Sequence, residues 1–262
     1  MTRPSWQDFG TYDESAYPEL WDGVVGAWCP SLGPTGLRLH DHSRYGNWGT
    51  LTNMDVQTCW GLSAGEYALT FDGVNNSVTT TLQMPTTPNR AFLCRVKYST
   101  TLANNNFDIA IGGGAASVGA GVYVGFGNNL QWGNTGFGCS QYGNGFAVTG
   151  YNDGKWHLGL CQHVGDNWSI HVDGVKVATK TMATTPTAGA VRIGNSITND
   201  YYQGDLSEII IWNRALTESE IQQLYAIGSC GMFQRRRRTL RRVAIEQATG
   251  ARRRRILCGD YS

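Results

Sequence analysis

The chain has 262 residues, among them 34 glycines, 12 tyrosines and 9 tryptophans, while only 16% of its residues are charged. That length suffices for one large β domain or two small ones, and many glycines among many aromatics indicate short strands joined by turns. No apolar run is long enough to span a bilayer, so we expect no membrane insertion. The N-terminal residues lack the apolar core of a secretory signal peptide.

Charge is divided sharply along the chain. The segment 235–262 holds ten arginines, no lysine and two acidic residues, a net charge of +8. The rest holds eleven basic and eighteen acidic residues, a net charge of −7, so the total of +1 hides a bipolar molecule. We expect an acidic body with a basic C-terminal tail.

In chain order, residues 1–19 show no clear periodicity and are interpreted as an N-terminal arm. From residue 20 onward, short and partly alternating apolar runs predict antiparallel strands. These runs cover residues 23–30, 66–73, 77–84, 90–100, 107–113, 121–127, 155–163, 167–174, 175–181, 190–196 and 206–213. No alternation of strands with helices is seen, so the pattern favours an all-β sandwich of two antiparallel sheets.

Two local signals are sharper than the rest. The turn clusters V-G-D-N and D-G divide residues 155–181 into three strands, which is typical of a meander of two hairpins. After the last strand, Thr217 and Glu220 form a capping box that predicts a short helix. We expect Ile221, Leu224 and Tyr225 on its apolar face, with Leu216 as a hydrophobic staple and Gly228 as its end.

Seven cysteines form an odd, widely spaced set without a C-x-x-C pattern or a zinc-finger arrangement. This favours buried free thiols over a disulfide framework and fits assembly in a reducing cytoplasm.

Several motifs occur in a recognisable order: LWDGVVGAWCP, YALTFDGVNNSV, DGKWHLGLCQHV, WSIHVDGVKV and GDLSEIIIWNRALTESEI. In this order, over about residues 20–228, the chain resembles the laminin G-like domains of the concanavalin A-like lectin/glucanase superfamily. The resemblance implies a jelly-roll sandwich and a role as a lectin, an adhesion module or a glycosidase. We therefore expect an arm at 1–19, a sandwich domain at 20–231 and an Arg-rich docking tail at 232–262.

The resemblance also bears on metal binding and catalysis. A family loop that can hold calcium appears here as DHSRYGNWG, with Arg44 where glycine is common. Asp41 and Asn47 could offer oxygen ligands, and the resemblance implies that Asp205 or Glu208 approaches this loop across the sandwich. The interpretation that we favour is that Asp41 and Asn47 satisfy turn backbone through their side chains. Calcium is possible and no other cofactor is expected. The paired carboxylates E-x-D-x-x-E of the glucanase branch are missing, so we expect no enzymatic activity.

A sugar site is predicted in the stretch 128–146, NNLQWGNTGFGCSQYGNGF, where amides and aromatics could bind hydroxyls and stack on sugar rings. Trp132, Asn128 and Gln131 are the candidate carbohydrate-binding residues. Most other tryptophans lie in apolar strand patterns typical of core residues: Trp28, Trp60, Trp156, Trp168 and Trp212.

The arginine tail has two interpretations. Arginine-rich tails bind phosphates without sequence preference. Apolar residues between the arginine blocks instead favour docking on an acidic protein surface. On that interpretation the partner-binding residues are Arg235, Arg236, Arg237, Arg238, Leu240, Arg241, Arg242, Val243, Ile245, Arg252, Arg253, Arg254 and Arg255.

Three functions remain open. Laminin G-like domains with an Arg-rich ending resemble phage and other viral structural proteins, which implies a capsid decoration or fibre component in the virion. Its partners would be a capsid protein, other copies of the chain and surface glycans. The alternatives are a free carbohydrate-binding lectin or adhesion module, and a nucleic-acid-binding protein acting through its tail.

Overall fold

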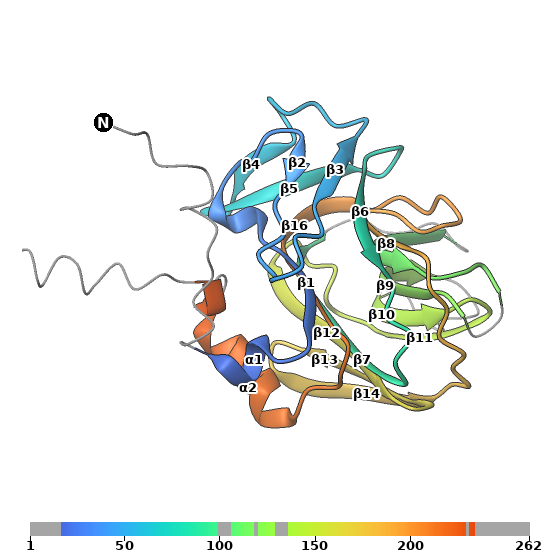
Figure 1. Ribbon diagram of the computed structural model, residues 1–262. Coiled ribbons are helices and arrows are strands. Elements are labelled where there is room, and N and C mark those ends of the chain that lie inside the picture. Colours follow the sequence, from blue (N-terminus) through green and yellow to red (C-terminus); the bar gives the residue numbers. More distant parts are fainter. Residues whose placement is uncertain (1–16, 99–105, 118–119, 129–135, 229–230, 234–262) are drawn as a thin grey trace, which may run out of the picture.

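The fold is a sandwich of two antiparallel sheets packed face to face (Figure 1). The computed structural model describes residues 17–98, 106–117, 120–128, 136–228 and 231–233. The predicted all-β sandwich with one short C-terminal helix is confirmed.

Within the described residues, each sheet contains eight strands. Sheet A consists, in spatial order, of β14 (Val175–Thr181), β13 (Asn167–Val172), β12 (Trp156–Val164), β7 (Asn89–Lys97), β16 (Gln203–Trp212), β5 (Glu66–Asp72) and β4 (Trp60–Ser63), with β1 (Val24–Trp28) paired to β16. Sheet B consists of β11 (Asn144–Val148), β10 (Gly136–Gln141), β9 (Val122–Asn128), β8 (Asn106–Gly113), β15 (Ala190–Ile193), β6 (Ser77–Gln83), β3 (Gly49–Thr52) and β2 (Arg38–Leu39).

The central strands of sheet A are apolar on both faces. In β16, Ile209 and Ile211 point into the core between the sheets, whereas Ile210 and Trp212 belong to a second cluster on the outer face. This outer cluster is covered by α1 (Pro18–Trp21), α2 (Glu218–Ile227) and the short 3-10 helix η3 (Gly231–Phe233). The covering explains why the run IIIW lacks the alternation of a half-exposed strand.

Helix α2 begins as predicted. Thr217 accepts a hydrogen bond from the backbone N–H of Glu220, and the Glu220 carboxylate accepts one from the Thr217 backbone N–H. Ile221 and Leu224 are buried, but Tyr225 is 50% exposed, so its predicted place on the apolar face is wrong. Its side chain lies beside Gly174, at the hairpin turn between β13 and β14.

That hairpin also forms as predicted. Asp173 and Gly174 have φ values of +52° and +82°, the two positive angles that a type I′ turn requires. The meander β12–β13–β14 follows the predicted order, with β12 also paired to β7.

Both ends of the described chain pack on the outer face of sheet A. Tyr17 lies against the outer cluster, and Met232 and Phe233, which the sequence assigns to the tail, are 3% and 7% exposed within it. The Phe233 ring meets Trp21 edge-on at 5.4 Å and His42 at 5.4 Å. The packed sandwich therefore extends to residue 233.

An arginine and a histidine form a buried pair near one end of the core. Arg90 and His163 are both 0% exposed, and Arg90 Nε donates to His163 Nε2 at 2.8 Å. His163 Nδ1 lies 2.9 Å from the Gly165 carbonyl oxygen, and its ring stacks on Trp168 at 4.3 Å. Since Nε2 accepts from arginine, the ring proton must sit on Nδ1.

The cysteines in the described part of the chain are buried free thiols, as expected: Cys29, Cys59, Cys94, Cys139 and Cys161. Burial raises the pKa of Cys94 and Cys161 well above that of a free thiol, which makes both inert. Cys230 and Cys258 lie outside the described residues.

Candidate functional site

A cavity of about 220 Å³ lies on the outer face of sheet B, the face turned away from the helices (Figure 1). Strands β8, β9 and β10 form its floor, and the β10–β11 turn and the loop before β16 form its wall. The lining residues are Phe107, Ile109, Tyr123, Ser140, Gln141, Tyr142, Gly143, Thr198 and Asp200.

Glycine is required where strands of this floor approach closely. A Cβ at Gly125 would lie 2.2 Å from the Asp108 carbonyl oxygen, and one at Gly138 would lie 2.2 Å from the Phe146 carbonyl oxygen. Neither backbone oxygen can move without breaking the sheet, so the small residues let β8–β11 pack closely.

The wall loop is held by its own hydroxyls. The Asp200 carboxylate oxygen Oδ2 accepts hydrogen bonds from Ser196 Oγ and Thr198 Oγ1, both at 2.6 Å. Ser196 Oγ in turn accepts the Asp200 backbone N–H at 3.1 Å. Tyr201 forms an isolated bridge to Ile109 on β8, which fixes Thr198 and Asp200 beside the sheet.

The chemistry of the cavity is aromatic and hydroxyl-rich. Tyr123 is 6% exposed, and its hydroxyl has no hydrogen-bond partner in the described part of the chain. Burial, with a smaller contribution from Asp200, raises the pKa of Tyr123 to about 12, so the phenol is neutral at physiological pH. Tyr142, at 40% exposure, supplies an accessible ring at the rim. Such a mixture of apolar surface and a few polar groups is typical of small-ligand sites.

The predicted sugar-binding stretch contributes to this cavity through different residues. Ser140, Gln141, Tyr142 and Gly143 of the stretch 128–146 line it. Asn128 is the last residue of β9, whereas Gln131 and Trp132 lie outside the described residues. Carbohydrate binding by these three stays a prediction.

The predicted calcium ligands Asp41 and Asn47 share one tight loop. The Asp41 oxygens accept hydrogen bonds from the backbone N–H groups of Ala27, Ser43 and Asn47 at 2.5–2.8 Å and from Ser43 Oγ at 2.7 Å. The Asn47 side chain donates to the Val25 carbonyl at 2.9 Å. A calcium ion would have to displace these donors, and calcium binding here stays a prediction.

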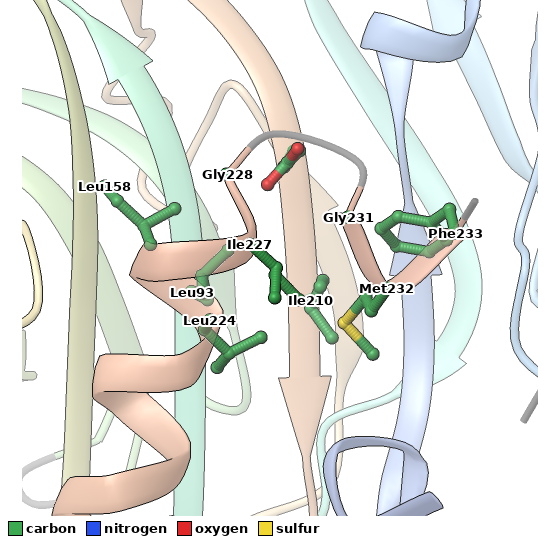
Figure 2. A pocket seen from close by; sticks show the side chains of 10 residues that line it. Leu93, Leu158, Ile210, Leu224, Ile227, Gly228, Gly231, Met232 and Phe233 are labelled. Atoms are coloured by element: carbon green, nitrogen blue, oxygen red, sulfur yellow. The ribbon is translucent and has the colours of Figure 1, made fainter. Parts of the chain in front are cut away.

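Glu208, the third predicted ligand, lies under α2 and η3, and its part in a calcium site stays a prediction. It is 4% exposed and lines an apolar cavity of about 10 Å³, space for one water molecule at most. Figure 2 shows Leu224 and Ile227 of α2 and Met232 of η3 closing this cavity over Ile210 of β16. No cluster of three or more potential metal-ligating His, Cys, Asp or Glu residues occurs in the described residues.

The predicted partner-binding residues of the tail, Arg235–Arg255, lie outside the described residues. None of the described helices is long and apolar enough to cross a membrane.

The family model for the concanavalin A-like lectin/glucanases superfamily matches residues 72–222. No curated protein sequence matches the chain significantly.

Solved structures of similar fold include three saccharide complexes. A Trypanosoma rangeli sialidase bound to sialic acid matches with a TM-score of 0.56 at 14% identity over 78% of this chain, which spans 33% of the sialidase. Domain 4 of the arabinanase AbnA from Geobacillus stearothermophilus, bound to arabinotriose, matches with a TM-score of 0.55 at 13% identity. That match covers 80% of this chain and 98% of the arabinanase domain. The binding domain of botulinum neurotoxin DC in complex with SialylT matches with a TM-score of 0.55 at 12% identity. That match covers 79% of this chain and 52% of the neurotoxin domain.

These structures correct one expectation. The sequence predicts a protein without enzymatic activity, but sialidases and an arabinanase are enzymes that contain this fold. The missing E-x-D-x-x-E pattern therefore excludes one type of glucanase site and not catalysis in general. At this level of identity the likeness shows the fold.

Proposed function

Because the chain belongs to the concanavalin A-like lectin/glucanases superfamily, we propose that it binds glycans through the cavity on sheet B. The observation that carries this proposal is Tyr123, which lines the cavity and whose buried hydroxyl has no partner within the described chain. A buried hydroxyl without a hydrogen bond costs roughly 1–3 kcal/mol, and a sugar hydroxyl is a suitable partner. The saccharides bound to the arabinanase domain and the sialidase, which share the fold, support this proposal.

Matched tyrosines provide the test. Tyr142 at the cavity rim and Tyr67 on β5 of sheet A are both 40% exposed. Tyr142→Ala is expected to weaken binding on a glycan array by about fivefold, because stacking on an exposed ring contributes on the order of 1 kcal/mol. Tyr67→Ala removes the same ring from the other sheet and should leave binding unchanged. Equal losses in both variants would refute the assignment of the cavity.

We further propose that the sandwich belongs to a virion structural protein, a capsid decoration or fibre component made in the host cytoplasm. The support lies in the sequence, where residues 1–234 carry a net charge of −7 and the tail carries a net charge of +8. A basic tail suits docking on the acidic surface of a capsid protein or of a neighbouring copy. Apolar residues between the arginine blocks suit a buried interface better than a nucleic-acid backbone.

Leu240→Asp separates protein docking from nucleic-acid binding, because it keeps all ten tail arginines. Protein docking predicts that this variant no longer co-sediments with assembled particles. A tail that binds nucleic acid would instead be insensitive to Leu240→Asp, and its affinity would follow arginine number and salt concentration.

A further inference from the structure

The charge of the cavity is one-sided. Among its nine lining residues, Asp200 carries the one formal charge. Two hydroxyl donors, Ser196 Oγ and Thr198 Oγ1, hold its Oδ2 atom. Oδ1 accepts no hydrogen bond from the described part of the chain and retains its capacity to accept one from a ligand hydroxyl.

Arg192 is the cation that acts on the Tyr123 pKa, and no ion pair between it and Asp200 occurs among the described residues. Arg192 on β15 does not line the cavity, and its Nη1 atom donates to the Ser196 carbonyl oxygen at 3.1 Å. At the Tyr123 hydroxyl, Asp200 raises the pKa more than Arg192 lowers it. An anionic ligand group in the cavity would thus meet a carboxylate without a compensating cation from the lining residues.

The size of the cavity limits the ligand. Its volume of about 220 Å³ is below the roughly 300–1,000 Å³ usual for drug-sized ligands. One sugar ring, placed beside the rings of Phe107 and Tyr142, is the appropriate scale. The neutral Tyr123 hydroxyl can both donate to and accept from its hydroxyls.

We infer that the cavity takes the terminal ring of a neutral saccharide, through Asp200 and Tyr123, and rejects acidic sugars such as sialic acid. The inference rests on the proposed glycan-binding function and adds the ligand class. Juxtaposed like charges disfavour binding strongly enough to decide between two sugars of similar size.

The test uses the full chain with arabinotriose as a neutral probe and sialyllactose as an acidic one, by calorimetry and on a wider array of neutral and acidic glycans. We expect binding to members of the neutral set alone. Asp200→Asn should weaken the affinity for neutral glycans by about tenfold. It should also reduce the difference between the affinities for neutral and acidic glycans. The control is Asp22→Asn, which makes the same charge change at an exposed carboxylate, 77% exposed, near α1 on the opposite face.

Tyr123→Phe provides the second variant. Because the hydroxyl has no partner among the described residues, its removal should leave the melting temperature unchanged or raised while lowering neutral-glycan affinity about fivefold. Lost stability with unchanged binding would contradict its role toward a ligand.

The outcomes distinguish the two proposals. Tighter binding of acidic glycans that is lost in Tyr142→Ala overturns the neutral specificity while the glycan function stands. Neutral binding unaffected by Asp200→Asn overturns the assignment of that carboxylate. No binding to any glycan on the array refutes the proposed function itself.

Discussion

Acidification should destabilise the protein through His163. Protonation of Nε2 would place a hydrogen against the Arg90 Nε–H group, 2.8 Å away, and a second positive charge beside a buried arginine. Burial, followed by the charge of Arg90, accordingly lowers the pKa of His163 to about 4. An unfolded chain has a histidine pKa of about 6.5, so the unfolded state binds the proton first as the pH falls.

The magnitude follows from the two pKa values. Stability from this pair is present above pH 6.5 and is lost as the pH falls toward 4. Between about pH 7.5 and about pH 4.5 the difference amounts to about 2.5 kcal/mol of unfolding free energy. His163→Gln keeps an acceptor for Arg90 and cannot titrate, so it should lose about 2.5 kcal/mol less over the same interval.

Urea unfolding at a series of pH values measures this difference. Other groups also titrate. Burial lowers the pKa of His42 to about 3, so His42 also destabilises the fold on acidification. Burial raises the pKa of Asp108 to about 6, so Asp108 has the opposite effect on stability. Both remain in the variant, so the comparison of wild type with His163→Gln isolates His163. Parallel stability curves for the two proteins would refute the reasoning.

Three further substitutions test the packing around the site and the chain end. Phe233→Ala should cost about 3 kcal/mol of unfolding free energy, since its ring is buried against Trp21; a loss below 1 kcal/mol by urea titration would show that η3 is not anchored. Gly125→Ala should cost about 2 kcal/mol in the same assay, because its Cβ would strike backbone, whereas Gly61→Ala, with open space around it, serves as control. Asp41→Asn should cost about 2 kcal/mol by removing charged hydrogen bonds to three backbone amides. A calcium-dependent rise in melting temperature that Asp41→Asn abolishes would instead show that the loop takes the ion.

Local signals predict the fold because each rests on nearby residues. The capping box needs Thr217 and Glu220, and the type I′ turn needs Asp173 and Gly174. Sequence periodicity does not predict the strands β10 and β11, because the glycines and asparagines of this region have low strand propensity. Their glycines are set by close approach to a neighbouring backbone, which periodicity does not reveal.

The cavity could not be predicted as a unit. Tyr123 and Asp200 are far apart in the chain and meet because the loop before β16 returns over β8 through Tyr201. Tyr123 lies in a strand where apolar and aromatic residues indicate packing, and nothing local marks its hydroxyl as unpaired. The sequence did indicate residues 140–143, through their aromatic and amide content.

Tyr17 and Phe233 both pack on the outer face of sheet A, which gives the molecule two different ends, and this difference matters for avidity. If several copies were attached to a surface through the chain before Tyr17 or after Phe233, the cavity on sheet B of each copy would face away from that surface. Under the proposed function, each single-ring site would bind weakly, and neighbouring sites on such a surface would raise one another's effective concentration. Simultaneous engagement can then exceed the affinity of one site by roughly 10²–10⁴-fold without any new contact.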